Sequence, residues 1–110
     1  MVTSMRNEIE FKEYETDIVS NKKSAVLYFF ADWCISCKTV SALVETESSD
    51  DSIIWLKMNT EEAPNIVKHY KIKGLPSLLF FKEGTLYSRM TGNISRDELS
   101  NKLVSIKEGK

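Results

Sequence analysis

Residues 29–38 read Phe29-Phe30-Ala31-Asp32-Trp33-Cys34-Ile35-Ser36-Cys37-Lys38 and join an apolar run to an amphipathic one. The apolar run, residues 25–31, is typical of a central strand that is covered on both faces. Beyond Cys34, apolar residues recur at intervals of three and four, which predicts an amphipathic helix. Those residues are Cys37, Val40 and Val44. The stretch therefore predicts a buried strand, a short turn and then a helix.

The two cysteines of the chain lie three positions apart within this stretch. A bridge across two intervening residues closes a loop too short to stabilise a small fold by much. Chemistry explains the pair better, because a helix N-terminus stabilises the thiolate of Cys34, and the thiolate is the species that attacks a disulfide. Cys37, one helical turn along, could then attack the mixed disulfide formed on Cys34. We expect Cys34 to be the nucleophile and Cys37 the resolving thiol.

Two other interpretations of the pair remain open at this point, a buried structural pair and a zinc site. A closed zinc site takes four ligands, and His69 is the only obvious third one. His69 lies in a polar stretch, where an exposed helical position without a catalytic role is expected. We therefore expect no metal and no cofactor.

Length and composition favour one soluble domain over residues 1–110, with 42% hydrophobic and 28% charged residues and no repeat or linker. Fifteen basic and sixteen acidic residues leave a formal charge of -1, which gives no reason to expect a nucleic acid or membrane partner. Residues 1–8 lack the apolar core of a secretory signal, and no run reaches membrane-spanning length. We expect a cytoplasmic monomer.

The first half of the chain predicts further elements around the central strand. Residues 5–11 fit either a short edge strand or the start of a helix, whereas residues 12–20 have helical spacing. Residues 53–58 form another apolar strand. A short helix follows, opened by Glu61-Glu62-Ala63-Pro64, because acidic residues and proline are favoured in a first turn.

The last third predicts an antiparallel pair and a final helix. Residues 77–81 and 86–91 flank a turn in which Gly84 can take a positive φ. Ser95 and Glu98 match a capping box before a helix with apolar residues on one face. The element order predicts an α/β fold: a central mixed sheet of four to five strands with helices on both faces.

Two segments resemble the thioredoxin family. Residues 29–34 resemble the strand that leads into the active site of thioredoxins, and Tyr70-Lys71-Ile72-Lys73-Gly74-Leu75-Pro76-Ser77 resembles the segment before their fourth strand. The resemblance continues through residues 80–84 to Gly92 and covers the chain almost end to end. It implies the thioredoxin fold and a reductase of protein disulfides that works by dithiol-disulfide exchange. A separate reductase would then reduce the cysteine pair again.

The resemblance also implies roles for residues near the cysteines. Trp33 shields the active site, and Pro76 takes the cis form and faces the cysteines. The backbone of Leu75 pairs with an extended substrate segment, while Gly92 keeps the neighbouring loop low enough for a protein to approach. An apolar rim that includes Ile35 would bind substrate segments with little sequence selectivity.

The dipeptide between the cysteines departs from the family, because thioredoxins usually have Gly-Pro where this chain has Ile35-Ser36. The redox potential therefore cannot be transferred, and an oxidant or isomerase stays an alternative. The motif also resembles that of the periplasmic, thioredoxin-like C-terminal domain of the bacterial transmembrane thiol:disulfide interchange protein, which we rank second. Ser36 is expected to cap the helix rather than to hydrogen-bond a thiolate.

A second departure is Tyr28, which occupies the position of the buried aspartate that serves the resolving thiol in thioredoxins. Its lysine partner is retained as Lys57. An unpartnered lysine in a core is costly, so Lys57 should hydrogen-bond Tyr28 or reach solvent. We hypothesise that Tyr28, Lys57 and water replace the carboxylate less efficiently. These departures keep a further alternative open, a binding module of the same fold with weak redox activity.

Overall fold

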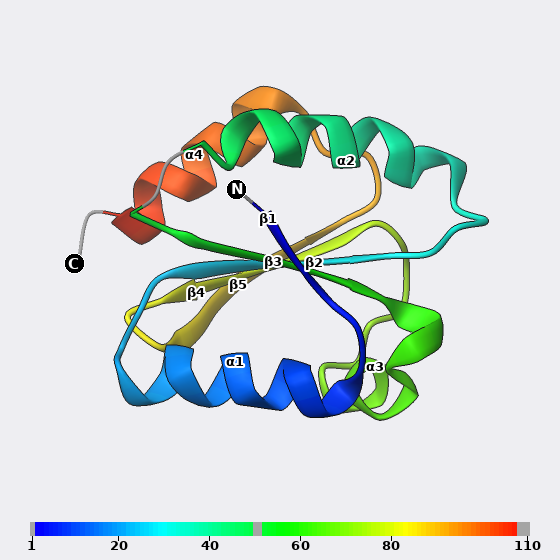
Figure 1. Ribbon diagram of the computed structural model, residues 1–110. Helices are drawn as coiled ribbons and strands as arrows, with labels where there is room; N and C mark the ends of the chain where they lie inside the picture. Colours follow the sequence, from blue (N-terminus) through cyan, green and yellow to red (C-terminus); the bar gives the residue numbers. More distant parts are fainter. Residues whose placement is uncertain (1, 50–51, 108–110) are drawn as a thin grey trace.

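The computed structural model of the chain describes residues 2–49 and 52–107 (Figure 1). Within those residues the strands and helices alternate before an antiparallel hairpin and a last helix. The strands are β1 (Val2–Met5), β2 (Ala25–Phe30), β3 (Ile54–Asn59), β4 (Ser77–Lys82) and β5 (Thr85–Thr91). The helices are α1 (Glu8–Ser20), α2 (Ile35–Glu47), the 3-10 helix η1 (Thr60–Glu62), α3 (Pro64–His69) and α4 (Arg96–Lys107).

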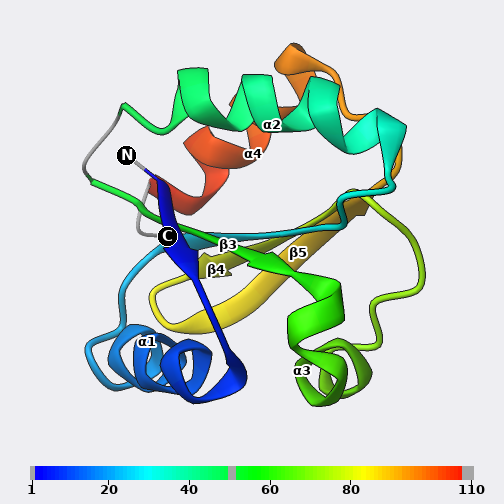
Figure 2. The same ribbon diagram turned by 45° about the vertical axis from the view of Figure 1, so that its right-hand side comes forward.

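The strands form one mixed sheet in the order β1-β3-β2-β4-β5. β2 lies at its centre, parallel to β3 and antiparallel to β4, and β1 and β5 form the two edges. Figure 2 shows α1 and α3 on one face of the sheet and α2 and α4 on the other. The prediction of an α/β fold, with a mixed sheet of four to five strands covered on both faces, is confirmed.

The side chains of β2 alternate between two hydrophobic cores. Leu27 and Phe29 belong to the core under α1 and α3, whereas Val26 and Tyr28 belong to the core under α2 and α4. Successive side chains of a strand point to opposite faces, so a strand covered on both sides must be apolar throughout. This double burial explains why residues 25–30 read as a continuous apolar run.

The first strand is the element that the sequence left ambiguous. The structure places it at Val2–Met5, before the expected residues 5–11, and α1 begins at Glu8. Asn7 caps that helix, since its side chain accepts a hydrogen bond from the backbone N–H of Glu10 at 2.9 Å. The strand is short and has β3 as its one partner among the described residues, so it carries little period-two signal.

The short helix expected from Glu61 is divided in two, because Glu61 and Glu62 lie in η1 and α3 begins at Pro64. Local signals placed the hairpin turn and the start of the last helix well. Glu83 and Gly84 both have positive φ, 50° and 82°, as a two-residue hairpin turn between antiparallel strands requires. Ser95 and Glu98 form the predicted capping box through two reciprocal hydrogen bonds of 3.1 Å each. A membrane-crossing helix, which needs a long apolar stretch, does not occur within residues 2–49 and 52–107.

Candidate active site

The cysteine pair lies where β2 gives way to α2. Cys34 is the N-cap residue of the helix, and Cys37 lies one turn further along. The two form a disulfide with their Cα atoms 5.3 Å apart, so the chain is in its oxidised form. Cys34 is 6% exposed and Cys37 3%. The pair therefore lies at a helix N-terminus and is almost fully buried.

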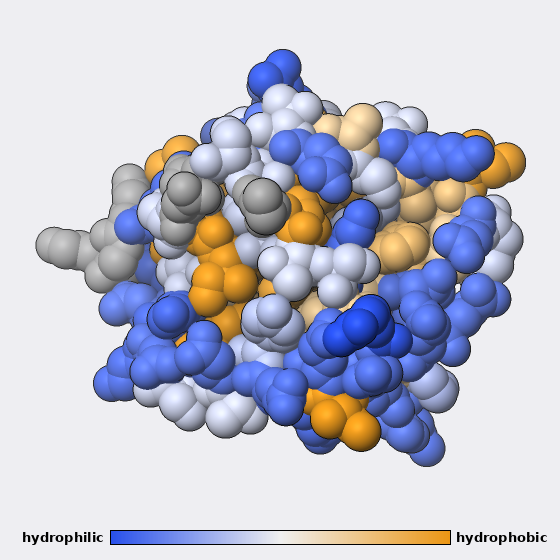
Figure 3. All heavy atoms as spheres, in the orientation of Figure 1, coloured by the Kyte–Doolittle hydropathy of each residue, from blue (hydrophilic) through white to orange (hydrophobic). Residues whose placement is uncertain are grey.

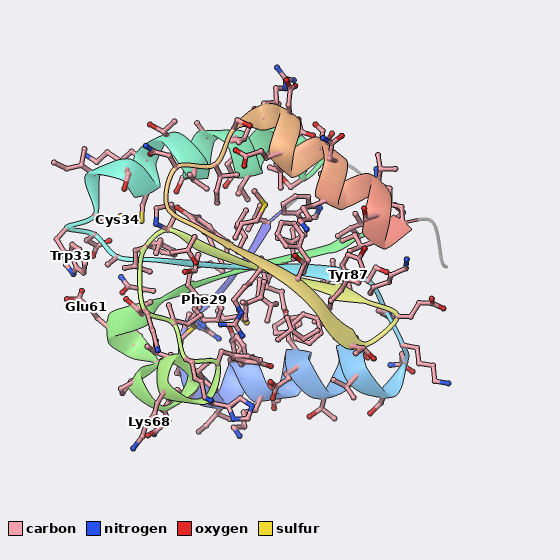
Figure 4. All side chains as sticks on the ribbon, turned by 180° about the vertical axis from the view of Figure 1, so that it is seen from behind. Phe29, Trp33, Cys34, Glu61, Lys68 and Tyr87 are labelled. Carbon is pink, nitrogen blue, oxygen red and sulfur yellow. A yellow bond between two sulfur atoms is a disulfide. The ribbon has the colours of Figure 1, made fainter. Side chains whose placement is uncertain are left out.

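Two large apolar side chains project beside this buried pair. Trp33 is 67% exposed and Ile35 is 82% exposed, although both flank Cys34 directly. In Figure 4, Trp33 and Cys34 lie together at one end of the sheet, opposite Tyr87. The surface is otherwise largely hydrophilic on the face drawn in Figure 3, where hydrophobic residues form small separate groups. An apolar surface thus adjoins the redox-active bond.

The loop before β4 closes the other side of the pair. Leu75 is half-buried and packs against the cluster that Cys34 and Cys37 form. The Leu75–Pro76 peptide bond is cis, as the resemblance implies. The Pro76 carbonyl accepts a hydrogen bond from the Gly92 backbone N–H at 2.9 Å, which ties this loop to the end of β5. The structure therefore places Leu75 against the cysteine pair and joins Pro76, the next residue, to Gly92.

The expected capping role of Ser36 is wrong. The structure has Cys34 at the N-cap with no side-chain capping bond, and Ser36 is already the second helical residue. A side chain caps a helix from the position before its first helical residue, which explains why Ser36 is too late. Its Oγ instead lies 3.6 Å from Cys34 Sγ.

Tyr28 lies directly beneath α2. Its hydroxyl donates a hydrogen bond to the Cys37 carbonyl oxygen at 2.8 Å and lies 2.6 Å from Ser41 Oγ. Burial raises the pKa of the Tyr28 hydroxyl, and the hydrogen bond with Ser41 offsets this only in part. The group stays protonated at neutral pH and acts as a donor, not as a base. Sequence reasoning missed Ser41, although its position four residues after Cys37 puts it on the same helix face.

Lys57 and Tyr28 are neighbours in β3 and β2, but the Tyr28 hydroxyl bonds to Cys37 and Ser41 and the contacts of the Lys57 ammonium lie elsewhere. The Lys57 side chain is 33% exposed, and its Nζ lies 3.9 Å from Glu45 on α2. The same Nζ lies 6.0 Å from the centre of the Phe30 ring. Of the two positions expected for this lysine, the structure has the one that reaches solvent.

His69 is exposed at the end of α3, and its ring centre lies 4.8 Å from that of Tyr70. No group of three or more His, Cys, Asp or Glu side chains in the described residues is arranged to hold a metal ion.

Comparison with known proteins identifies the family. The family model for thioredoxin matches residues 6–105 of the chain. The chain belongs to the thioredoxin family. It is 34% identical to the thioredoxin of Acidithiobacillus ferridurans over 89 residues, which cover 79% of this chain and 82% of that protein. It is 30% identical to the thioredoxin of Pyropia yezoensis over 105 residues, 94% of this chain and 95% of that one.

Solved thioredoxins share the same fold at lower identity. Thioredoxin O2 of Arabidopsis thaliana, in its oxidised state, superposes with a TM-score of 0.86 at 21% identity, over 97% of this chain and 95% of that one. Thioredoxin NaTrxh of Nicotiana alata superposes with a TM-score of 0.89 at 20% identity, over 97% of this chain and 93% of that one. Family, fold and the Cys34–Cys37 pair make this thioredoxin-family chain a thiol-disulfide oxidoreductase of the protein-disulfide-reductase kind. Protein disulfides and an electron-donating reductase are the partners that this family membership indicates.

Proposed function

We propose that Cys34 attacks protein disulfides and that Cys37 resolves the product. The thiolate of Cys34 forms a bond to one substrate sulfur, the substrate S–S bond breaks, and the leaving sulfur takes up a proton. Cys37 then loses its proton and attacks Cys34 Sγ, which releases the second substrate thiol. The substrate gains two electrons and two protons, and the chain ends as the Cys34–Cys37 disulfide.

The observation that carries this assignment of roles is the place of each cysteine on α2. Cys34 is the N-cap residue, where unpaired backbone N–H groups favour a thiolate, and Cys37 is the more buried of the two. An attacking sulfur must meet a substrate from outside, whereas a resolving sulfur needs to reach only its neighbour. Both requirements favour Cys34 as the nucleophile.

The substrate-binding surface in this proposal consists of the exposed and half-buried residues around the disulfide. Trp33 and Ile35 supply apolar contacts, and Ser36 shapes the turn between the cysteines. The backbone of Leu75 pairs with an extended substrate segment beside Pro76, and Gly92 leaves room for it. The exposure of Trp33 and Ile35 and the packing of Leu75 against the cysteine pair support this surface.

We further propose that residues 1–110 work as one domain, as a monomer, in the cytoplasm. A reductase of disulfides acts in a compartment whose thiols are kept reduced, and the cytosol is such a compartment.

Insulin reduction and substrate trapping test the two roles. Cys37→Ser should accumulate a mixed disulfide with insulin, because the resolving attack is lost. The matched variant Cys34→Ser should form none and should reduce no insulin. A stable mixed disulfide on Cys34→Ser instead would reverse the roles of the two cysteines.

The alternative direction of exchange, an oxidant or isomerase, stays open in this proposal because Ile35-Ser36 replaces the usual Gly-Pro. Equilibration of the Cys34/Cys37 couple with glutathione separates the two. A potential near roughly -270 mV supports the reductase, and one above roughly -200 mV supports the alternative.

A further inference from the structure

A basic cavity of about 540 Å³ adjoins the candidate active site. It lies between the loop that follows α3 and strand β5. Its charged lining residues are Lys71 and Lys73 from the loop and Arg89 from the strand, with no carboxylate among the lining residues. Ser77 and Thr91 add two hydroxyl groups. Figure 4 shows the loop rising from α3 toward the end of the sheet where Cys34 and Trp33 lie.

The positive charge of this cavity has no carboxylate paired with it in the part of the chain that the structure describes. None of the ion pairs formed within residues 2–49 and 52–107 includes Lys71, Lys73 or Arg89. The chain as a whole has a formal charge of -1, so the excess of cations here is local. Three cationic side chains around one cavity, without a paired carboxylate, attract an anion.

Arg89 is held in place by the protein. Its Nη1 donates a hydrogen bond to the Tyr70 carbonyl oxygen at 2.8 Å. A guanidinium group has five N–H donors in a planar fork that matches a carboxylate, so this one bond orients the group and leaves donors for a ligand.

Lys71 occupies a backbone position that favours glycine. Its φ is 55°, in the left-handed region that a residue with a Cβ enters only at a cost. This residue is a lysine although glycine would fit the backbone better. Lys71→Gly therefore removes the positive charge without an expected loss of folding stability, because glycine adopts this backbone conformation at no steric cost.

The cavity lies within reach of a substrate at the disulfide. Gly74 lines it, and the next residue, Leu75, packs against the cysteine pair. Ser77 Oγ donates to the Gly74 carbonyl at 2.6 Å, which holds this corner of the loop together. An extended chain advances about 3.3 Å per residue. A substrate strand that pairs with Leu75 would thus reach the cations within a few residues.

We propose that this cavity binds an Asp or Glu side chain of the protein substrate, from the segment that flanks the disulfide under attack. The chain therefore prefers substrates whose reducible disulfide has carboxylates close by in sequence. This inference rests on the proposed function, since it assigns a class of substrate to the same site. It adds charge selectivity to a rim that is otherwise apolar.

The test compares short peptides that contain one intramolecular disulfide. One peptide has an acidic run before the cysteines and one has it after them, and each has a twin with Asn and Gln in place of Asp and Glu. The second-order rate constant of each reduction by the reduced protein is measured at low and high salt. We expect an acidic peptide to react several-fold faster than its twin at low salt, and this ratio to fall as salt is added.

Three variants connect the ratio to the cavity. Lys71→Gly, Lys73→Gln and Arg89→Gln should each lower this ratio, by about twofold per charge, and the triple variant should bring it to one. Lys102→Gln on α4, across the sheet, is the matched control and should leave it unchanged. Lys71→Gly should also unfold at no lower urea concentration than the wild type, which separates lost charge from lost folding.

The outcomes distinguish this inference from the function on which it rests. If the wild type reduces neither twin, the proposed function fails. If it reduces both twins at equal rates, the reductase stands and the carboxylate site is overturned. A ratio that persists in Lys71→Gly and in the triple variant would overturn the site as well.

Discussion

The Tyr28 hydroxyl donates a hydrogen bond to the carbonyl oxygen of Cys37 at 2.8 Å. A side chain of the central strand thereby holds the first turn of α2 at Cys37. Ser41 Oγ lies 2.6 Å from the same hydroxyl, so the strand contacts two successive turns of the helix. The position that holds a carboxylate in other thioredoxins is filled here by a neutral hydrogen-bonding group.

Removing this hydroxyl should weaken the fold. Tyr28→Phe keeps the ring but leaves the Ser41 hydroxyl without its partner, so the free energy of unfolding should fall by about 1–2 kcal/mol. Urea unfolding of the oxidised wild type and variant measures this difference in the free energy of unfolding. Ser41→Ala alone should cost less, because the bond from Tyr28 to Cys37 persists. An unchanged urea midpoint for Tyr28→Phe would contradict a role for this contact in stability.

A carboxylate at this position should change the resolving step. In Tyr28→Asp a base is available near Cys37, and the mixed disulfide should be resolved faster below neutral pH, by roughly tenfold or more. Both this variant and Tyr28→Asn lose a buried ring and should be less stable by about 3–5 kcal/mol. Stopped-flow kinetics of mixed-disulfide decay compares the two. Equal rates for Asp and Asn would show that no base is needed.

Two glycines with positive φ should respond differently to a methyl group. A Cβ at Gly84, where φ is 82°, would lie 3.0 Å from both Lys22 Cα and the Val19 carbonyl oxygen. At Gly92, where φ is 90°, it would meet nothing within 4 Å. Gly92→Ala should therefore cost about 1–2 kcal/mol for the dihedral alone, and Gly84→Ala more. Thermal unfolding of the two variants should rank them in this order.

The capping box should make stability depend on acid. The hydrogen bond from the Ser95 backbone N–H holds the pKa of Glu98 below its usual value. A lowered folded-state pKa stabilises the fold above the unfolded value of 4.5, and this contribution is lost as pH falls through the folded value. NMR titration of the Glu98 carboxyl should give a midpoint below 4.5. In Glu98→Gln, the part of the acid destabilisation that comes from this group should disappear.

The sequence was most informative where local signals and burial agree. The run at residues 25–31 is apolar because both faces of β2 are covered, and the cysteine spacing places the pair on one turn of α2. Ser95 and Glu98 signal a helix start that needs no tertiary contact. Elements of this kind can be predicted because their cause lies within a few residues.

Other features depend on partners that are remote in sequence. Lys57 has a long flexible side chain, and its contacts with Glu45 on α2 and with the Phe30 ring come from residues that its local sequence does not reveal. The spacing of Ser41 from Cys37 indicates its helix face, but its partner is known only once Tyr28 is seen to lie beneath it. The basic cavity joins the loop at Lys71 to Arg89 on β5. The pairing of β5 with β4 and the hydrogen bond from Arg89 to the Tyr70 carbonyl bring the two together.

The place of β1 at the edge of the sheet has a consequence for how the chain folds. β4 and β5 are joined by two residues and can pair as soon as that segment collapses. β1 must instead wait for β3, since Val2 pairs with Trp55. Contacts between distant residues carry the larger loop-closure entropy and form late. The N-terminal strand should be among the last parts of the sheet to form, and its amides among the first to exchange with solvent.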